Sequence, residues 1–264
     1  MPYLIPGYHA VRETLHRRGI PVREVWIAQG VKSRRCREIE DLAKNLGIPV
    51  RTRGGRELGG HLPGVVHQGI MAVAERYAYA DLEETIRAAR KEPGSGLLVA
   101  ADHLTDEGNL GAVIRTAAFF RAHGFIIPRD RSASVTPRVM KRSAGAAALI
   151  PVVRVVNLGR ALDRLEKEGF WVIGAAGEGT QSVYRTDWDR DVVLVVGNEQ
   201  KGLSPGVRKR CRELVSIPVR GPVASLNVAV AAGAVLSEIT RRRVHSGPDS
   251  RPSGQPEAVG RGKV

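Results

Sequence analysis

Cysteines and long apolar runs are scarce in this chain of 264 residues. Cys36 and Cys211 are its two cysteines and neither sits in a CxxC pattern, so we expect no disulfide framework or zinc site and a reducing, cytoplasmic location. The seven histidines form no HExxH or similar spacing, and we expect no bound metal. The chain contains no run of about eighteen apolar residues, the length that spanning a membrane requires, so we expect no membrane span. The N-terminus also lacks the basic and apolar regions of a signal peptide.

Acidic residues are too few to balance the basic ones. The chain holds 41 Lys and Arg against 27 Asp and Glu, a formal net charge of +14. Such an excess favours a polyanionic partner, because phosphates release condensed counterions when cations bind them. A lineage with an Arg-rich proteome is the alternative explanation. Residues 1–80 carry 13 basic and 7 acidic residues, and residues 241–264 carry 6 and 2, so we expect nucleic acid to dock at the front segment and the tail.

The chain divides into two expected folded units. Residues 1–77 predict a small α/β domain with helices at 8–18 and 34–46 and strands at 22–28, 48–50 and 67–77. Residues 78–96 predict a linker, in which a short acidic helix from Asp81 precedes the helix-breaking KEPGSG.

Residues 97–245 alternate continuous apolar runs with helical segments, which is typical of an α/β domain whose mostly parallel sheet is covered on both faces. The expected strands are 97–103, 124–128, 151–156, 170–175, 191–197 and 214–219. A basic helical segment is expected at 137–148. The tail 246–264 is polar and rich in Gly, Pro and Ser, and we expect it to be disordered.

Three loops after apolar strands have unusual content, and ligands bind in such loops of open parallel sheets. The first begins at Asp102 and leads to Asn109, which precedes a helix predicted from Leu110. Asn109 could be only an N-cap, with Arg115 on the surface. Because Arg115 has small apolar neighbours, we expect it to be partly buried or aimed at a ligand.

The second loop contains Glu199 between Gly197 and Gly202. Glycines let backbone groups approach a ligand closely, although an ordinary strand-to-helix turn would also explain them. The pattern is not a phosphate-binding P-loop. GAAGEG at 174–179 is not GxGxxG either, so we reject a dinucleotide-binding fold.

The third loop runs from Ile217-Pro218 to Ser225-Leu226-Asn227. Ser225 is a suitable N-cap for a helix reaching about Arg243. That helix begins with many small residues, which permit close packing of another backbone or of a partner subunit.

Taken in order, the three loops resemble the motifs of the SpoU (TrmH-like) branch of the SPOUT methyltransferase superfamily. The matching segments are Asp106-Glu-Gly-Asn109-Leu-Gly-Ala-Val-Ile-Arg115, Gly197-Asn-Glu199-Gln-Lys-Gly202-Leu, and Ile217-Pro218 with Ser225-Leu226-Asn227-Val228. Further likeness, in Gly7-Tyr-His9-Ala-Val, His67-Gln-Gly69 and Ser143-Ala-Gly145-Ala, is to the subgroup with an added N-terminal RNA-binding domain. The resemblance covers roughly residues 3–243. Glu107 stands where the family usually has Pro, and Ala229 where many members have Ser.

The resemblance implies a C-terminal SPOUT domain with a deep trefoil knot, an N-terminal domain similar to ribosomal protein L30e, and a homodimer with active sites near the subunit interface. It also implies S-adenosylmethionine-dependent methylation of a ribose 2′-hydroxyl, with a guanosine of 23S ribosomal RNA as the expected substrate. A transfer-RNA methyltransferase, a family enzyme that methylates adenosine and a non-catalytic RNA-binding protein are the alternatives.

The same resemblance assigns roles to residues of the three loops. Arg115, Glu199 and Asn109 are expected to be catalytic. Ser225 and Asn227 are expected to shape the RNA pocket. The cofactor is expected to contact the backbone around Gly197, Ile217 and Leu226.

Overall fold

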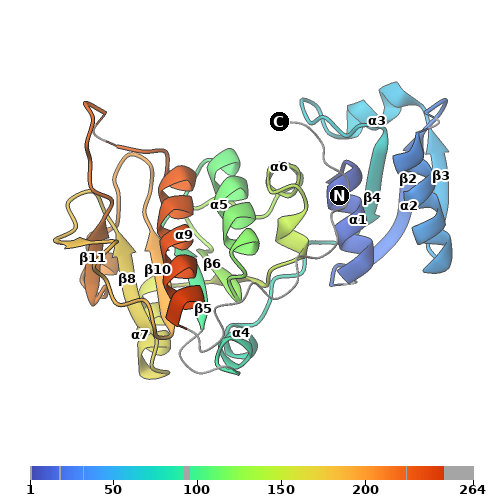
Figure 1. Cartoon of the computed structure of the whole chain (residues 1–264). Helices are drawn as coiled ribbons and strands as arrows, with labels where there is room; N and C mark the ends of the chain where they lie inside the picture. The colour runs from blue at the N-terminus through green and yellow to red at the C-terminus, as the bar shows by residue number, and fades with distance from the viewer. Residues whose placement is uncertain (1, 18, 32, 92–95, 224, 247–264) are drawn as a thin grey trace.

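The computed structural model describes residues 2–17, 19–31, 33–91, 96–223 and 225–246. The first part of the chain forms a four-stranded sheet of order β1-β4-β2-β3 (Figure 1). Its strands are β1 (Tyr3–Pro6), β2 (Val22–Ala28), β3 (Val50–Arg53) and β4 (Ile70–Ala74). The pairs β1–β4 and β2–β4 are antiparallel and β2–β3 is parallel.

Three helices accompany this sheet: α1 (Tyr8–Arg17), α2 (Arg34–Asn45) and α3 (Gly55–His61). Helix α2 begins where the Ser33 side chain accepts a hydrogen bond from the Cys36 amide at 3.1 Å, a standard N-cap. It buries Cys36, Ile39 and Ala43, the apolar stripe that made the segment predictable as a helix. The sequence prediction missed β1 and α3.

The second part of the chain forms a seven-stranded sheet of order β7-β6-β5-β10-β8-β11-β9. Every pair of neighbouring strands in it is parallel, which confirms the predicted mostly parallel sheet. Its strands are β5 (Leu97–Ala101), β6 (Gly124–Pro128), β7 (Val152–Val155), β8 (Trp171–Ala175), β9 (Gln181–Ser182), β10 (Val192–Val196) and β11 (Glu213–Ser216).

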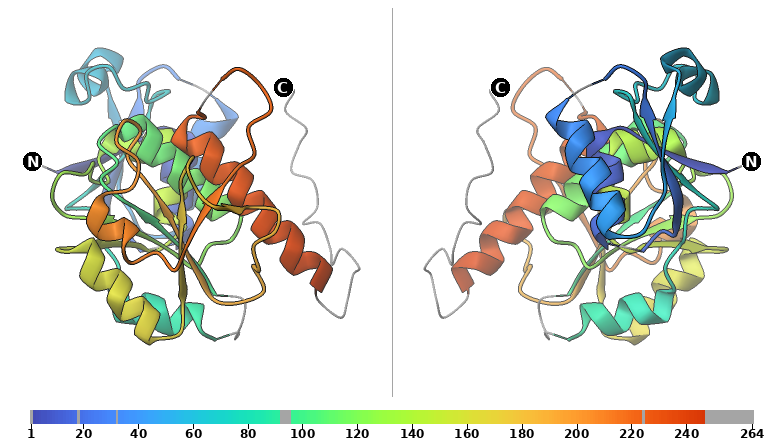
Figure 2. Two further views of the ribbon diagram at one scale, coloured as in Figure 1. Left: turned by 90° about the vertical axis from the view of Figure 1, so that its left-hand side faces the viewer. Right: turned by 90° about the vertical axis from the view of Figure 1, so that its right-hand side faces the viewer.

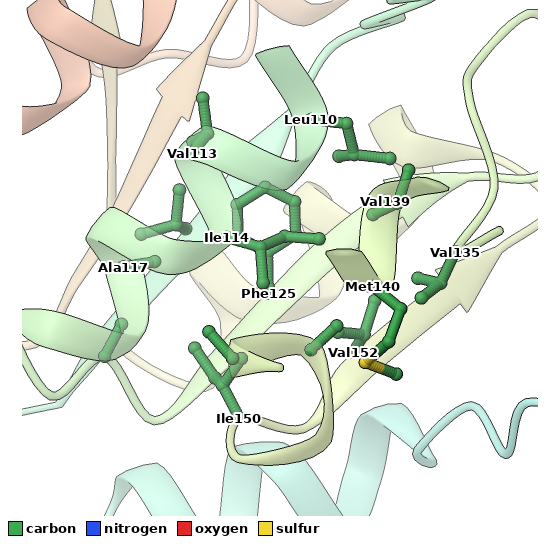
Figure 3. Close-up of a cluster of buried hydrophobic side chains, with 14 of the residues drawn as sticks. Leu110, Val113, Ile114, Ala117, Phe125, Val135, Val139, Met140, Ile150 and Val152 are labelled. Atoms are coloured by element: carbon green, nitrogen blue, oxygen red, sulfur yellow. The ribbon is translucent and has the colours of Figure 1, made fainter. Parts of the chain in front are cut away.

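Helices cover both faces of this sheet (Figure 2). They are α4 (Leu82–Ala89), α5 (Glu107–Phe119), α6 (Pro137–Arg142), the 3₁₀ turn η1 (Ala146–Ala148), α7 (Leu158–Lys167), α8 (Pro205–Arg208) and α9 (Val228–Ser246). Alternate residues of β5 enter two different cores: Val99 packs with α5, α6 and α9, and Leu98 packs with α4 and α7. Figure 3 shows the first core where α5, α6 and β6 meet.

Helix boundaries differ from the prediction for local reasons. Helix α5 begins at Glu107 because the Asp106 side chain caps it, accepting from the Asn109 amide at 2.7 Å. Helix α6 ends before Ala144 and Gly145, which have positive φ values of 51° and 87°. Helix α9 begins at Val228, so Ser225 is not its N-cap. Most of the predicted tail, 247–264, lies outside the described residues.

Candidate active site

Side chains from the three predicted loops meet at the carboxyl edge of the large sheet. The amide nitrogen Nδ2 of Asn227 donates to Oδ1 of Asn109 at 2.8 Å. Nδ2 of Asn109 in turn donates to Oε1 of Glu199 at 2.8 Å. This Asn227–Asn109–Glu199 chain, which we name the relay, joins residues separated by up to 118 positions in sequence.

Local structure fixes both asparagines of the relay. Asn109 lies in the first turn of α5, and its backbone amide is held by Asp106. Asn227 immediately precedes α9, and its Oδ1 accepts from the Ala229 amide at 2.9 Å. Because each amide group is committed at both ends, the Glu199 carboxylate receives an oriented donor and keeps its second oxygen available.

The loop that carries Glu199 is closed by paired backbone hydrogen bonds. Asn198 and Gly202 each donate to the other's carbonyl at 2.9 Å, and the Asn198 side chain donates to the His103 carbonyl at 2.8 Å. Gly202 has a φ of +63°, which favours glycine. A Cβ on Gly197 would lie 2.6 Å from both the Gly202 oxygen and the Leu203 nitrogen, so only glycine fits there.

Asp102, which directly follows β5, links that strand to the segment after the Glu199 loop through a hydrogen bond. Its side chain is 1% exposed, accepts from the Ser204 amide at 2.6 Å and lies 2.6 Å from Nδ1 of His103. Burial, with a smaller contribution from Asp102, raises the pKa of Cys211 to about 12, so that thiol stays protonated. No role was predicted for Asp102. Its position directly after a fully apolar strand is a signal that could have marked it as a buried carboxylate of the site.

Arg115 lies apart from the relay within one chain. It is on α5, offset from Asn109 by about 9 Å along the helix and about 120° around it. The side chain is exposed, which excludes the first of the two expected alternatives, partial burial, and leaves the second, a side chain aimed at a ligand. Its buried apolar neighbours face the core while Arg115 faces outward. Within the described residues it makes no hydrogen bond or ion pair. Ser225 is exposed as well.

The residues expected to hold a cofactor provide a glycine cradle beside uncovered apolar side chains. Gly197 admits no side chain, and Ile217 is half-buried against the large core. Leu226 is 52% exposed and Val223 is 70% exposed. The Ser216 carbonyl accepts the last backbone hydrogen bond of β11, from Val183 at 3.0 Å, and none is made in the described part of 217–226. Such a combination suits a ligand with a flat apolar ring and polar edges.

Two further properties bear on the chemistry. Across the described residues, no His, Cys, Asp or Glu side chains gather in a group that could hold a metal ion. Among the described helices, none has the length and apolar character that crossing a membrane requires.

Comparison with known proteins places both parts of the chain. Residues 96–237 match the SpoU rRNA Methylase family, and residues 4–80 match the family described as RNA 2'-O ribose methyltransferase substrate binding. The chain is 40% identical over 240 residues to the 23S rRNA (guanosine-2'-O-)-methyltransferase RlmB of Pseudomonas aeruginosa, covering 90% of this chain and 95% of the relative. It is 42% identical over 243 residues to the RlmB of Xanthomonas campestris pv. campestris, covering 91% and 96%.

A solved structure agrees with these relatives. The SpoU methyltransferase AviRb from Streptomyces viridochromogenes, in complex with the cofactor AdoMet, superposes with a TM-score of 0.79 and 29% identity over 93% of this chain and 92% of that one. The chain belongs to the SpoU rRNA Methylase family.

Proposed function

We propose that this protein is an S-adenosylmethionine-dependent methyltransferase that modifies the 2′-hydroxyl of a guanosine ribose in 23S ribosomal RNA. The observation that carries the proposal is the relay, which unites the three motif loops at the edge of the sheet where ligands of such folds bind. The RlmB relatives cover nearly the whole chain and carry this activity in their names. A ribosomal RNA substrate places the protein in the cytoplasm.

The two parts of the chain take different tasks in this proposal. Residues 1–77 form an L30e-like domain that recruits RNA, residues 78–96 link it, and residues 97–245 form the methyltransferase domain. The match of residues 4–80 to a substrate-binding family supports this division.

We further propose that the methyltransferase domain contains a deep trefoil knot. Strand β11 lies beyond β8 as seen from β10, whereas α9 packs against α5. The described residues between β11 and α9, 217–223 and 225–227, therefore cross back over the carboxyl edge of the sheet, past the loop that holds Glu199. This crossing is the feature that supports a threaded chain.

The cofactor site consists of backbone and apolar groups rather than charges. S-adenosylmethionine, when bound, would supply a methyl group carried on a sulfonium. The rest of the cofactor is a neutral thioether after the transfer, so this leaving group needs no general acid. Backbone around Gly197, Ile217 and Leu226 would hold the cofactor, with the uncovered side chains of the third loop against its adenine. The protein's remaining tasks are to align the ribose oxygen with the methyl group and to manage the hydroxyl proton.

The relay and Arg115 divide those remaining tasks. Asn109 and Asn227 orient the Glu199 carboxylate, whose second oxygen can accept a hydrogen bond from the ribose hydroxyl and take up its proton as the methyl group is transferred. Ser225 and Asn227 line the RNA side of the pocket. A guanidinium is effectively always protonated. Arg115 therefore stabilises the developing alkoxide or grips a neighbouring phosphate.

A homodimer would bring Arg115 to the relay of a second copy. Helix α9 exposes a stripe at helical spacing that includes Val230, at 57% exposed, and Ala234. Phe119 of α5, on the same face of the sheet, is 78% exposed. Large apolar side chains left uncovered on two adjacent helices mark an association surface. Arg115 lies on the outward side of α5 with Phe119, at the edge of that surface.

Methyl transfer to defined RNAs tests the proposal. The protein is incubated with labelled S-adenosylmethionine and unmodified 23S rRNA or total tRNA, and nuclease digests are analysed by nucleoside mass spectrometry. We expect 2′-O-methylguanosine from the ribosomal RNA. Product on tRNA alone would move the substrate to the alternative class. No product on either RNA, with no cofactor binding by calorimetry, would leave a non-catalytic RNA-binding protein.

A further inference from the structure

Three sequence motifs outside the active site meet at one place, where the N-terminal part of the chain touches the large domain. Gly145 packs against α1: a Cβ on it would lie 2.8 Å from Ala10 Cα and 3.0 Å from the His9 oxygen. Lys141 of α6 lies over Gly7, with Nζ 2.5 Å from the position of a Cβ. Its Nζ also lies 3.5 Å from Oε1 of Gln68. We name this contact between α1, the 67–69 turn and α6 the joint.

The backbone of the joint is held in costly conformations. Gln68 and Ala144 have positive φ values of 55° and 51°, although neither is glycine. Gly7, Gly69 and Gly145 are also left-handed. A non-glycine residue in this region costs of order 1 kcal/mol and persists where the surroundings impose it, which is common at functional sites.

The joint gathers positive charge that the protein does not compensate. Burial lowers the pKa of Lys141, and no carboxylate of the described residues pairs with it. Burial lowers the pKa of His9, and Arg35 and Lys141 lower it further. Burial and then Lys141 lower the pKa of His67. Every one of these groups is therefore disfavoured in its charged form, which a bound anion would reverse.

The nearest carboxylates are already occupied. Glu38 accepts from the Tyr8 hydroxyl at 2.7 Å and from Arg12 Nε at 2.9 Å. Glu13 accepts from the same arginine at 2.8 Å. Arg35 lies over the Tyr8 ring, 5.3 Å from its centroid, and its charge faces no carboxylate of the described residues. Glu38 and Glu13 thus pair with Arg12, and Glu13 offsets part of the lowering of the His9 pKa. No carboxylate of the described residues pairs with Lys141.

Helix α6 adds further basic side chains beside the joint. It lies between α1 and α5 (Figure 1) and carries the exposed Arg138 and Arg142 beside Lys141. A Cβ on Gly111 of α5 would lie 2.6 Å from Cβ of Arg142. The side chain of Arg142 therefore starts beside α5, the helix that carries Asn109. Nη2 of Arg138, in contrast, lies 3.8 Å from the position of a Cβ on Gly64, in the N-terminal part of the chain.

We propose that the joint is a binding site for the phosphate backbone of the RNA substrate, with Lys141 at its centre and the exposed Arg138 and Arg142 beside it on α6. A strand held there would be fixed to both parts of the chain at once, which sets the distance between the recruited RNA and the target ribose. Several cations in a row suit a polymer of phosphates better than a single small anion. The inference rests on the proposed function.

Salt-dependent RNA binding tests this site. Lys141→Met keeps the aliphatic stem and removes the charge, and Lys141→Arg keeps the charge. Lys167→Met is the matched control: it removes one charge from the exposed Lys167 of α7, a helix on the opposite face of the sheet. For each variant and the wild type, the Kd for a 23S rRNA fragment is measured from 50 to 300 mM KCl, and cofactor affinity is measured in parallel.

Lys141→Met should weaken RNA binding roughly fivefold and reduce the slope of log K against log salt by about 0.7 to 0.9. Lys141→Arg and Lys167→Met should match the wild type, and cofactor affinity should not change. Equal losses in Lys141→Met and Lys167→Met, or no loss in either, would overturn the site. These binding readouts are separate from turnover: a wild type that methylates RNA while Lys141→Met binds normally would reject the joint and keep the proposed function.

Discussion

Replacing Gly197 by alanine tests whether the loop of Glu199 must be closed as tightly as the structure shows. The new methyl group would lie 2.6 Å from the Gly202 oxygen and from the Leu203 nitrogen. Both are backbone atoms, so no side-chain rotation can relieve the clash. Gly202 must move, and the two hydrogen bonds that it shares with Asn198 lengthen.

The expected cost follows from these contacts. Overpacking of a tight site costs about 1–3 kcal/mol, and each weakened hydrogen bond costs about 0.5–1.5 kcal/mol. The free energy of unfolding should fall by about 2–6 kcal/mol, which lowers Tm by roughly 4–24 °C for a chain of this size. Since Gly197 also lines the proposed cofactor cradle, affinity for S-adenosylmethionine should fall at least about tenfold, equivalent to about 1.4 kcal/mol.

Thermal unfolding and calorimetric cofactor titration measure both effects. Gly206→Ala is the matched control, because its nearest neighbour would be the flexible end of Arg210 at 3.9 Å. The control should keep the wild-type Tm and affinity. If Gly197→Ala behaves like Gly206→Ala in both assays, the closed loop is not needed and the account of this site is wrong.

Two further predictions concern the dimer and the acid stability of α9. If Arg115 serves the site of a second copy, mixing and re-equilibrating the inactive variants Arg115→Ala and Asn109→Asp should restore about a quarter of wild-type turnover. The reason is that about half of randomly mixed dimers contain one copy of each variant, and each of these has one intact site out of two. No restored turnover would place the arginine and the relay in one chain. The pKa of Glu238 is lowered to about 2, chiefly by hydrogen bonds from Arg241 and then Arg242. Glu238→Gln should therefore lose about 1–2 kcal/mol of unfolding free energy at pH 7. Because the folded pKa lies below the ordinary value of 4.5, this wild-type advantage is complete above about pH 5 and should shrink as the pH falls toward 2. Urea unfolding across that range measures it, and an advantage independent of pH would contradict the assignment.

Local signals made parts of the fold predictable. Strand β2 has the predicted bounds, Val22–Ala28, because β-branched and aromatic residues follow one another there. Strand β6 also has its predicted bounds, Gly124–Pro128. Strand β1 was missed because four residues give no periodic pattern, and its pairing with β4 spans about seventy residues. Helix α3 was missed because three of its seven residues are glycine, and glycine pairs such as Gly59–Gly60 normally mark turns.

The active site was predictable in its parts but not in its contacts. The resemblance of the three loops, taken in order, to the motifs of the SpoU branch led us to predict Asn109, Glu199 and Asn227 as site residues. Their mutual hydrogen bonds depend on how β5, β10 and α9 are placed, which no local pattern encodes. The apolar neighbours of Arg115 in sequence did not decide between its burial and its exposure, because they face inward along α5 while the helix turns the arginine outward.

Single-turnover methyl transfer to unmodified 23S rRNA, measured for the wild type, Arg115→Ala and Arg160→Ala, tests the central claim most directly. Arg160 is an exposed arginine on α7, across the sheet from the relay. We expect 2′-O-methylguanosine from the wild type and from Arg160→Ala. Arg115→Ala should give no product while its cofactor affinity stays at the wild-type value. Near-normal product from Arg115→Ala would contradict its catalytic role, and no 2′-O-methylnucleoside from the wild type would contradict the proposed reaction itself.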